Sequence, residues 1–191
     1  MKAEGIAPDV LTFAGNGEPT AHPDFAAIID DTLLLRDRHF PQAKVSVLTN
    51  ATRIILPEVH KALMKIDNNI VKLDTVDVGY ISRVDRPTGK YDLNAIIDSM
   101  RAFEGHCVVQ TMFMKGNIKD KEGNYTSVDN CKDEYIQPYI EALKKINPKQ
   151  VMIYTLDREW PTEGLEKVDK DTMDTIAQKL RNAGFDTSVS Y

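Results

Sequence analysis

The sequence contains only two cysteines, Cys107 and Cys131, in 191 residues. A chain of this length with so few cysteines cannot be held together by a disulfide framework. It also lacks the run of about 18 apolar residues that a membrane-spanning helix needs. Its first residues lack the apolar core of a signal peptide. We therefore expect a cytoplasmic protein with no membrane association.

The sequence also has no excess of positive charge, because 24 Lys and Arg residues stand against 29 Asp and Glu residues, a formal net charge of −5. This balance argues against a broad nucleic-acid-binding surface but leaves room for a small anionic ligand held by backbone amides. The content of 42% hydrophobic and 28% charged residues is typical of a globular protein. Since no repeat, low-complexity segment or linker interrupts the chain, we predict a single domain over residues 1–191.

Short apolar runs rich in β-branched residues alternate along the chain with segments whose apolar residues recur at helical spacing. This alternation predicts βαβ units and a mainly parallel sheet, which curls into either an open doubly wound sheet or a barrel. A polar segment over 115–133 is long for a connection in such a protein and is predicted to be a loop that acts as a lid. The expected strands are Val10–Ala14, Val45–Asn50, Ile70–Asp74, Cys107–Phe113, Val151–Leu156 and Phe185–Val189, and the expected helices lie between them.

Active sites of parallel α/β folds form at the carboxyl ends of the strands, so the residues that follow each strand are candidates. After the first strand, Gly15 and Gly17 on either side of Asn16 allow backbone N–H groups to approach a ligand closely. Glu18, stiffened by the following Pro19, suits an ammonium group. A Gly-x-Gly by itself is more often a simple turn, and polar strand ends are also explained by solvent. The second strand ends in Thr49 and Asn50, and the third ends in Asp74 with Asp77 beyond it. Lys115 follows the fourth strand, and Asp157 and Arg158 follow the fifth.

The first of these segments, Leu11–Thr20 continued by His22–Phe25, resembles the "GGE" segment of the radical S-adenosylmethionine (radical SAM) superfamily. Further stretches in the same order along the chain resemble this family. They are Val47–Asn50 with its terminal "TN", Lys72–Asp74, Val84–Pro87, Thr111–Gly116 and Thr155–Arg158, and several are similar to the iron–sulfur oxidoreductases near the wyosine-type and activating-enzyme groups. The resemblance extends over nearly the whole chain, which makes it more specific than one motif.

The resemblance implies a partial (β/α) barrel around S-adenosylmethionine (SAM) and a 4Fe–4S cluster. In that family, reduction cleaves SAM to a 5′-deoxyadenosyl radical that abstracts a substrate hydrogen, with flavodoxin or ferredoxin as the electron donor. Carried over by position, Glu18 would bind the methionine ammonium, with Gly15, Asn16 and Gly17 shaping that contact. Thr49, Asn50 and Asp74 would line the region of the carboxylate and ribose. Lys115 and Arg158 are candidate substrate contacts.

The sequence departs from the family in its cysteines. The family holds its cluster by C-x3-C-x2-C upstream of the GGE segment, whereas Cys107 and Cys131 lie downstream of it, 24 positions apart. Neither cysteine nor any spaced set of histidines replaces this motif, so we expect no cluster in this chain. The run at Val10 would then be the second strand of the barrel, with the first β/α unit missing. We expect a fragment that retains the SAM-binding part, inactive alone, from a truncation or a gene called at an internal methionine.

Two other hypotheses remain at this point. The chain is alternatively a non-catalytic domain that lost the cluster loop and binds only a ligand or partner. A third interpretation is an ordinary (β/α) barrel enzyme that uses Glu18, Asp74 and Lys115 for acid–base catalysis without iron or SAM. The substrate also stays open, since the resemblance allows either a glycyl-radical-type protein or transfer RNA.

Overall fold

A computed structural model describes residues 5, 7–15, 17–119, 123–157 and 163–191 of the chain. Its main sheet has six strands in the order β1-β2-β3-β4-β7-β9, and every neighbouring pair is parallel. The α/β class and the mainly parallel sheet predicted from the sequence are thereby confirmed. These strands are β1 (Val10–Phe13), β2 (Lys44–Thr49), β3 (Asn68–Lys72), β4 (Val108–Phe113), β7 (Gln150–Thr155) and β9 (Thr187–Ser190).

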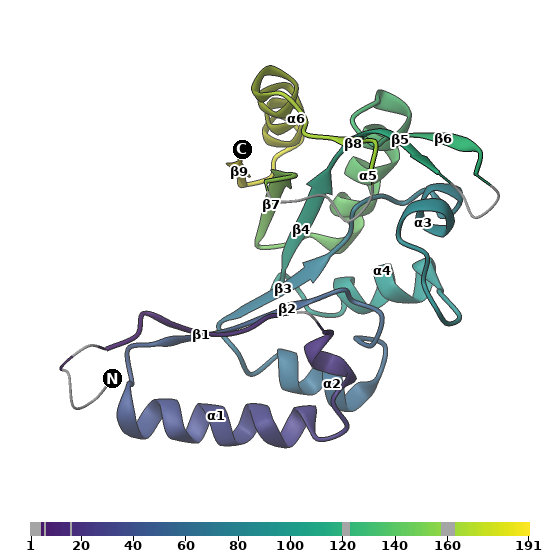
Figure 1. Cartoon of the computed structure of the whole chain (residues 1–191). Helices are drawn as coiled ribbons and strands as arrows, with labels where there is room; N and C mark the ends of the chain where they lie inside the picture. Colours follow the sequence, from purple (N-terminus) through teal and green to yellow (C-terminus); the bar gives the residue numbers. More distant parts are fainter. Residues whose placement is uncertain (1–4, 6, 16, 120–122, 158–162) are drawn as a thin grey trace.

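Five helices pack their apolar stripes against one face of this sheet, where they share a single core with its buried valines and isoleucines. The strands twist so that the sheet follows a curved path with the helices along its outer side (Figure 1). These helices are α1 (Phe25–His39), α2 (Pro57–Leu63), α4 (Leu93–Arg101), α5 (Asp133–Ile146) and α6 (Lys170–Asn182). Gly184 follows the C-terminal end of α6 with a φ of 98°, the left-handed conformation in which glycine commonly ends a helix.

The opposite face of the sheet is concave and only half buried. Side chains alternate between the two faces of a strand, so the burial of Val71 and Val109 against the helices leaves Lys72 and Gln110 on the concave face. Lys72 pairs in register with Gln110, and Gln110 pairs with Met152. A row of half-buried, partly polar side chains therefore crosses the inside of the curve.

The segment 115–133 differs from its predicted form as a loop. It contains β5 (Lys115–Lys119) and β6 (Tyr125–Asp129), which pair as an antiparallel hairpin, and β5 also pairs with β8 (Leu165–Glu166). Only one face of this small sheet is buried, through Ile118 and Val128. The two strands therefore contain few apolar residues, and the sequence did not indicate them as strands. Gly116 is required where β5 passes the loop before β8, because a Cβ there would lie 2.1 Å from the Gly164 carbonyl oxygen.

Two short elements were not predicted from the sequence. One is the helix α3 (Val78–Val84), on which the hairpin packs. The other is a 3-10 turn, η2 (Pro19–Ala21), which follows the loop after β1. Tyr80, Met114, Ile118, Val128 and Leu156 form a second, smaller apolar cluster between α3 and the hairpin. This cluster fixes the hairpin beside the carboxyl ends of β3 and β4. None of the helices in the described ranges is long and apolar enough to cross a membrane.

Candidate functional site

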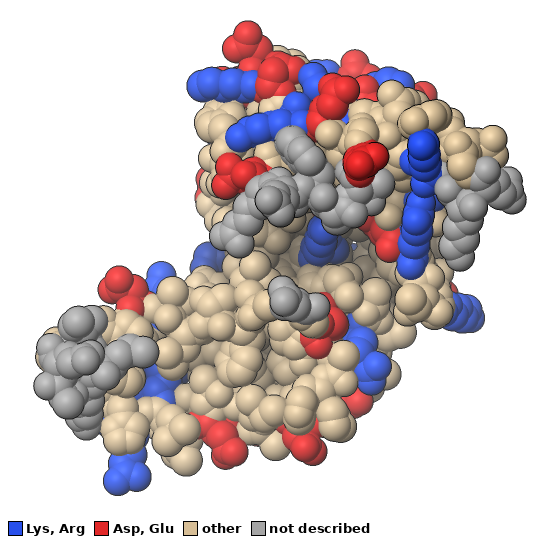
Figure 2. All heavy atoms as spheres, in the orientation of Figure 1, with Lys and Arg blue, Asp and Glu red and all other residues tan. Residues whose placement is uncertain are grey.

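The carboxyl ends of β1 to β4 open onto a continuous concave surface made of four adjoining cavities. Neighbouring cavities share lining residues: Glu18 and Asn50 belong to two that meet at the β1 loop, and Pro87 and Tyr91 belong to three around the loop after α3. Figure 2 shows a hollow between the part with β1 and α1 and the part with the hairpin, with Lys or Arg side chains inside it. This surface is where sequence analysis placed the site.

Glu18 lies at one end of this surface and is fixed by hydrogen bonds from two neighbouring segments. Its Oε1 accepts from the Thr20 amide at 3.1 Å, the Thr20 hydroxyl at 2.5 Å and the Thr49 hydroxyl at 2.6 Å, and its Oε2 accepts from the Asn50 amide at 2.7 Å. The carboxylate therefore caps η2 and ties the β1 loop to the end of β2. These bonds hold a half-buried carboxylate at the wall of the cavity in a single orientation.

Asn50 completes this corner. Its side-chain oxygen accepts from the Thr52 amide and hydroxyl at 3.0 and 2.7 Å, which orders the turn after β2. Asn50 lines three of the four cavities. One of these three is also lined by Gly15, Gly17, Glu18 and Thr49. The structure thus brings these sequence candidates together.

Lys72 and Asp74 form an ion pair on the concave floor, with 3.1 Å between Nζ and Oδ2. The Asp74 side chain is only 4% exposed, whereas that of Lys72 is 35% exposed. Asp74 Oδ1 accepts from the Met112 amide at 2.7 Å, so the carboxylate joins the ends of β3 and β4. Burial raises the pKa of Asp74, and the adjacent ammonium of Lys72 opposes that shift. The pairing offsets the cost of placing a lysine on the inner face of the sheet.

Asn130, at the base of the hairpin, supports the strand ends beside the site, and sequence reasoning missed it. It is 1% exposed, and its Nδ2 donates to the carbonyl oxygens of Asp74 and Met112 at 3.1 and 2.9 Å. Its Oδ1 accepts from the Met114 amide at 2.9 Å. Asn130 thereby fastens the hairpin to the strand ends beside the Lys72–Asp74 pair. No sequence pattern marks it, because its partners are backbone groups 16 to 56 positions away.

Asp85, directly after α3, lies in the stretch Val84–Pro87 that resembles the family, but it was not predicted as a site residue. It lines two cavities, one with the Lys72–Asp74 pair and one with Glu18. Partial desolvation and the negative charge of Asp74 raise the pKa of Asp85 from 3.8 to about 6, while the charge of Lys72 opposes this shift. The carboxyl group consequently changes its charge close to neutral pH.

We expect the free energy of unfolding to fall as pH rises from about 4 to about 6, because native Asp85 binds its proton more tightly than the unfolded chain does. The contribution is of the order of 1 kcal/mol, since water screens this exposed side chain. Asp85→Asn should flatten this part of the pH profile in urea unfolding experiments. Asp98→Asn, an exposed change on α4, should show the same pH profile of stability as the wild type. An unaltered profile in Asp85→Asn would show that another group titrates there.

Other strand-end candidates lie apart from these cavities or outside the described residues. Lys115 Nζ is 3.0 Å from Asp169 Oδ2 at the start of α6, and Lys115 is not among the residues that line the four cavities. Asp77 caps α3 by accepting from the Tyr80 amide at 2.5 Å. Asn16 and Arg158 lie outside the described residues, so their predicted roles, like that of Lys115 as a substrate contact, stay predictions.

The cysteines of the chain do not fit a 4Fe–4S cluster. Cys107 is 1% exposed in the main core, where burial raises its pKa to about 12. Cys131 follows the hairpin, is half buried, and also has a pKa raised to about 12, chiefly by desolvation. Cluster ligation needs thiolates gathered at one point, and high thiol pKa values oppose it. Across the ranges that the structure describes, no three His, Cys, Asp or Glu side chains are grouped to hold a metal ion.

Comparison with known proteins at the sequence level finds several relatives that are named UPF0026 protein, a name that states no activity. A UPF0026 protein of Helicobacter pylori strain J99 is 30% identical over 154 residues, which cover 78% of this chain and 44% of the relative. The chain thus spans less than half the length of this curated relative. No protein family model matches the chain.

Solved structures with a similar fold cover nearly the whole chain. A domain of pyruvate-formate lyase-activating enzyme from Bacteroides vulgatus covers 95% of this chain and 98% of that domain, with a TM-score of 0.63 and 18% identity. A radical SAM methyltransferase from Sphaerobacter thermophilus reaches a TM-score of 0.68 at 15% identity over 100% of this chain and 53% of its own. Streptococcus suis SuiB bound to S-adenosylmethionine has a TM-score of 0.64 at 13% identity, over 95% and 39% of the two chains. The resemblance predicted from the sequence is confirmed in three dimensions: this chain has the (β/α) fold of the radical SAM enzymes.

Proposed function

We propose that the chain binds SAM on the concave surface, as the cofactor-binding part of a radical SAM protein. The observation that carries this proposal is the fixed carboxylate of Glu18, which Thr20, Thr49 and Asn50 hold at the cavity wall. A carboxylate in a single orientation next to an open cavity is suited to a charge-assisted hydrogen bond from the methionine ammonium of SAM. In radical SAM enzymes the cofactor supplies the chemistry of hydrogen-atom abstraction.

The residues around Glu18 fit such a ligand. A Cβ placed on Gly15 or Gly17 would meet no atom within 4 Å, so a ligand can come close to the backbone of this loop. The cavity lined by these glycines measures about 360 Å³, and the adjoining one lined by Asn50 and Asp74 about 350 Å³. Cavities of several hundred Å³ are typical of small-molecule sites. We propose that Thr49, Asn50 and Asp74 lie along the carboxylate and ribose of the bound cofactor.

The described residues are proposed to bind SAM, and no step of SAM cleavage is assigned to them. Since Cys107 and Cys131 do not fit a cluster, we assign these residues no reaction that depends on iron and sulfur. The activity of any longer protein that contains this domain, and the predicted electron donors and macromolecular substrates, remain proposals from the resemblance.

Isothermal titration calorimetry with SAM tests the proposal. We expect Glu18→Gln, which keeps the shape of the side chain but removes its charge, to weaken SAM binding by about tenfold or more. Glu134→Gln on the exposed surface of α5 should bind like the wild type. A thermal unfolding curve of each variant separates lost binding from lost folding. Equal SAM affinity in the wild type and in folded Glu18→Gln would remove Glu18 from the site, and a wild type that does not bind SAM would end the proposal.

The geometry gives little support to acid–base catalysis by Glu18, Asp74 and Lys115. Both oxygens of Asp74 are already engaged, one with the Met112 amide and the other with Lys72. Lys115 pairs with Asp169 instead of facing them. The three side chains that this alternative requires therefore do not converge on one point.

A further inference from the structure

A second part of the concave surface has a chemistry that SAM binding does not account for. A cavity of about 740 Å³, larger than the other three along the concave surface, lies between α3, the loop after it and the β5–β6 hairpin. Val78, Ile81, Tyr91 and Ile118 give it an apolar lining. Its polar lining comes from hydroxyl side chains and from two arginines, Arg83 and Arg86. A cavity of this size with apolar walls and a few convergent polar groups is typical of a small-molecule site.

Neither arginine forms an ion pair with a carboxylate within the ranges that the structure describes, although Arg83 Nη1 and Asp77 Oδ1 both lie beside Gly79. Arg86 donates from Nε to the Arg83 carbonyl oxygen at 3.0 Å and from Nη2 to the Lys119 carbonyl oxygen at 3.4 Å, so its bonds go to neutral acceptors. No ion pair joins Arg83 to any described carboxylate. A guanidinium carries five donors in a planar fork that matches phosphate and carboxylate groups. Two of them on one cavity wall therefore favour an oxyanion.

Arg86 also stands where the backbone favours glycine. It follows the last turn of α3 with a φ of 47°, and its amide donates to the Ile81 carbonyl oxygen, the hydrogen bond of a helix C-terminus with a left-handed residue. A residue with a side chain costs more than glycine at such a φ. The hydrogen bonds from the Arg86 side chain to two carbonyl oxygens hold the guanidinium at the cavity wall. The positive charge is therefore placed at a backbone position that is strained for a residue other than glycine.

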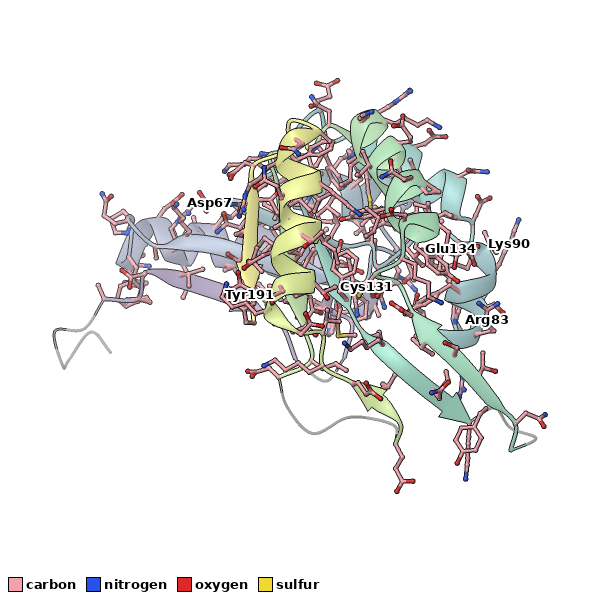
Figure 3. All side chains as sticks on the ribbon, turned by 90° about the horizontal axis from the view of Figure 1, so that it is seen from above. Asp67, Arg83, Lys90, Cys131, Glu134 and Tyr191 are labelled. Carbon is pink, nitrogen blue, oxygen red and sulfur yellow. The ribbon has the colours of Figure 1, made fainter. Side chains whose placement is uncertain are left out.

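The cavity is continuous with the proposed SAM site. Pro87 and Tyr91 line it together with the cavity of Lys72 and Asp74, and Thr88 and Gly89 line it together with the cavity of Glu18. Lys90, which lines the cavity of Glu18, lies on the same side of the molecule as Arg83 (Figure 3). A molecule in the arginine-lined cavity would therefore lie directly beside bound SAM.

We infer that this cavity binds a small organic anion, with a phosphate or carboxylate held by Arg83 and Arg86 and an apolar or aromatic body against Ile81, Tyr91 and Ile118. The assignment of this anion as the substrate rests on the proposed function, because it depends on SAM in the neighbouring cavity. The anion site itself does not depend on SAM. The net charge of −5 for the whole chain fits a local cationic pocket better than a surface for a polyanion.

The test measures the binding of 1-naphthyl phosphate, 1-naphthoate and neutral 1-naphthol by calorimetry to the 191-residue chain. We expect at least one of the two anions to bind at least tenfold more tightly than naphthol, and the tighter of the two identifies the preferred group. Arg83→Gln and Arg86→Gly should each weaken that anion about tenfold. Arg86→Gly should keep the fold, because glycine is the residue that a left-handed helix end prefers. Arg101→Gln on α4 serves as the matched control and should bind like the wild type.

The same set of proteins separates the two proposals. SAM binding should survive in Arg83→Gln, because Arg83 lines only the arginine-lined cavity, and naphthyl anion binding should survive in Glu18→Gln. Anion binding without SAM binding would overturn the proposed function and leave the anion site standing. Equal affinity for naphthol and the anions, or anion binding that both arginine variants retain, would overturn the anion site. Binding of a uridine oligonucleotide in place of both small anions would also overturn it, in favour of a nucleic acid.

Discussion

Replacing Asn130 by aspartate is expected to lower the free energy of unfolding by about 3–5 kcal/mol at neutral pH. The aspartate has the same shape, and one of its oxygens can still accept from the Met114 amide. Its other oxygen would replace the Nδ2 that donates to the carbonyl oxygens of Asp74 and Met112. A buried carboxylate would then face two acceptors at a position that is 1% exposed.

The pH dependence of this variant identifies the cause. Burial beside two carbonyl oxygens raises the pKa of the new carboxyl group above its value in the unfolded chain. The native variant then binds its proton more tightly, so the deficit should be largest above that raised pKa and shrink as pH falls through it. Urea unfolding at pH 5 and pH 8 measures the difference. Asn94→Asp, an exposed change in α4, should show neither the deficit nor the pH dependence. An Asn130→Asp protein as stable as wild type at pH 8 would refute the role given to this amide.

Much of the main sheet could be predicted from the sequence because its strands are buried runs flanked by amphipathic helices. β4 illustrates this, since the strand predicted over Cys107–Phe113 is observed over Val108–Phe113. The hairpin and α3 could not be predicted in this way. α3 has seven residues, and β5 and β6 each bury only one apolar side chain, so neither periodicity extends far enough to be recognised.

The site residues that the sequence predicted correctly are those that directly follow strands of the main sheet. Glu18, Asn50 and Asp74 follow parallel strands, and parallel strands necessarily bring their carboxyl ends to one edge. The same reasoning applied to Lys115 did not lead to the cavities, because the chain continues from β4 into the hairpin and Lys115 begins β5.

The residues that sequence reasoning missed depend on three-dimensional placement. Asp85 and Arg86 matter because the second apolar cluster holds α3 against the hairpin. Asn130 matters because its amide meets backbone groups of distant strands. The stretch Val84–Pro87 resembles the family, but the sequence does not show that it lies beside the hairpin, and no local pattern marks Asn130.

A double-mutant cycle on the ion pair of Lys72 and Asp74 is expected to give a coupling energy of about 2 kcal/mol. Lys72→Met keeps the aliphatic stem but leaves the Asp74 carboxylate, 4% exposed, with only the Met112 amide as a partner. We expect this change to cost about 3 kcal/mol at neutral pH. Asp74→Asn should cost about 1 kcal/mol, because the amide oxygen still accepts from Met112 and the half-exposed Lys72 can turn to water.

The double variant Lys72→Met with Asp74→Asn is therefore expected to be more stable than Lys72→Met alone, since it contains no unpaired buried charge. Acidification should also restore stability to Lys72→Met, because the pKa of its unpaired Asp74 rises and protonation neutralises the group. Urea unfolding of the four proteins at pH 5 and pH 8 gives both quantities. Strictly additive effects would mean that the ammonium contributes nothing to the buried carboxylate. The Lys72–Asp74 pair would then not stabilise the strands, and its charges would be explained by ligand binding alone.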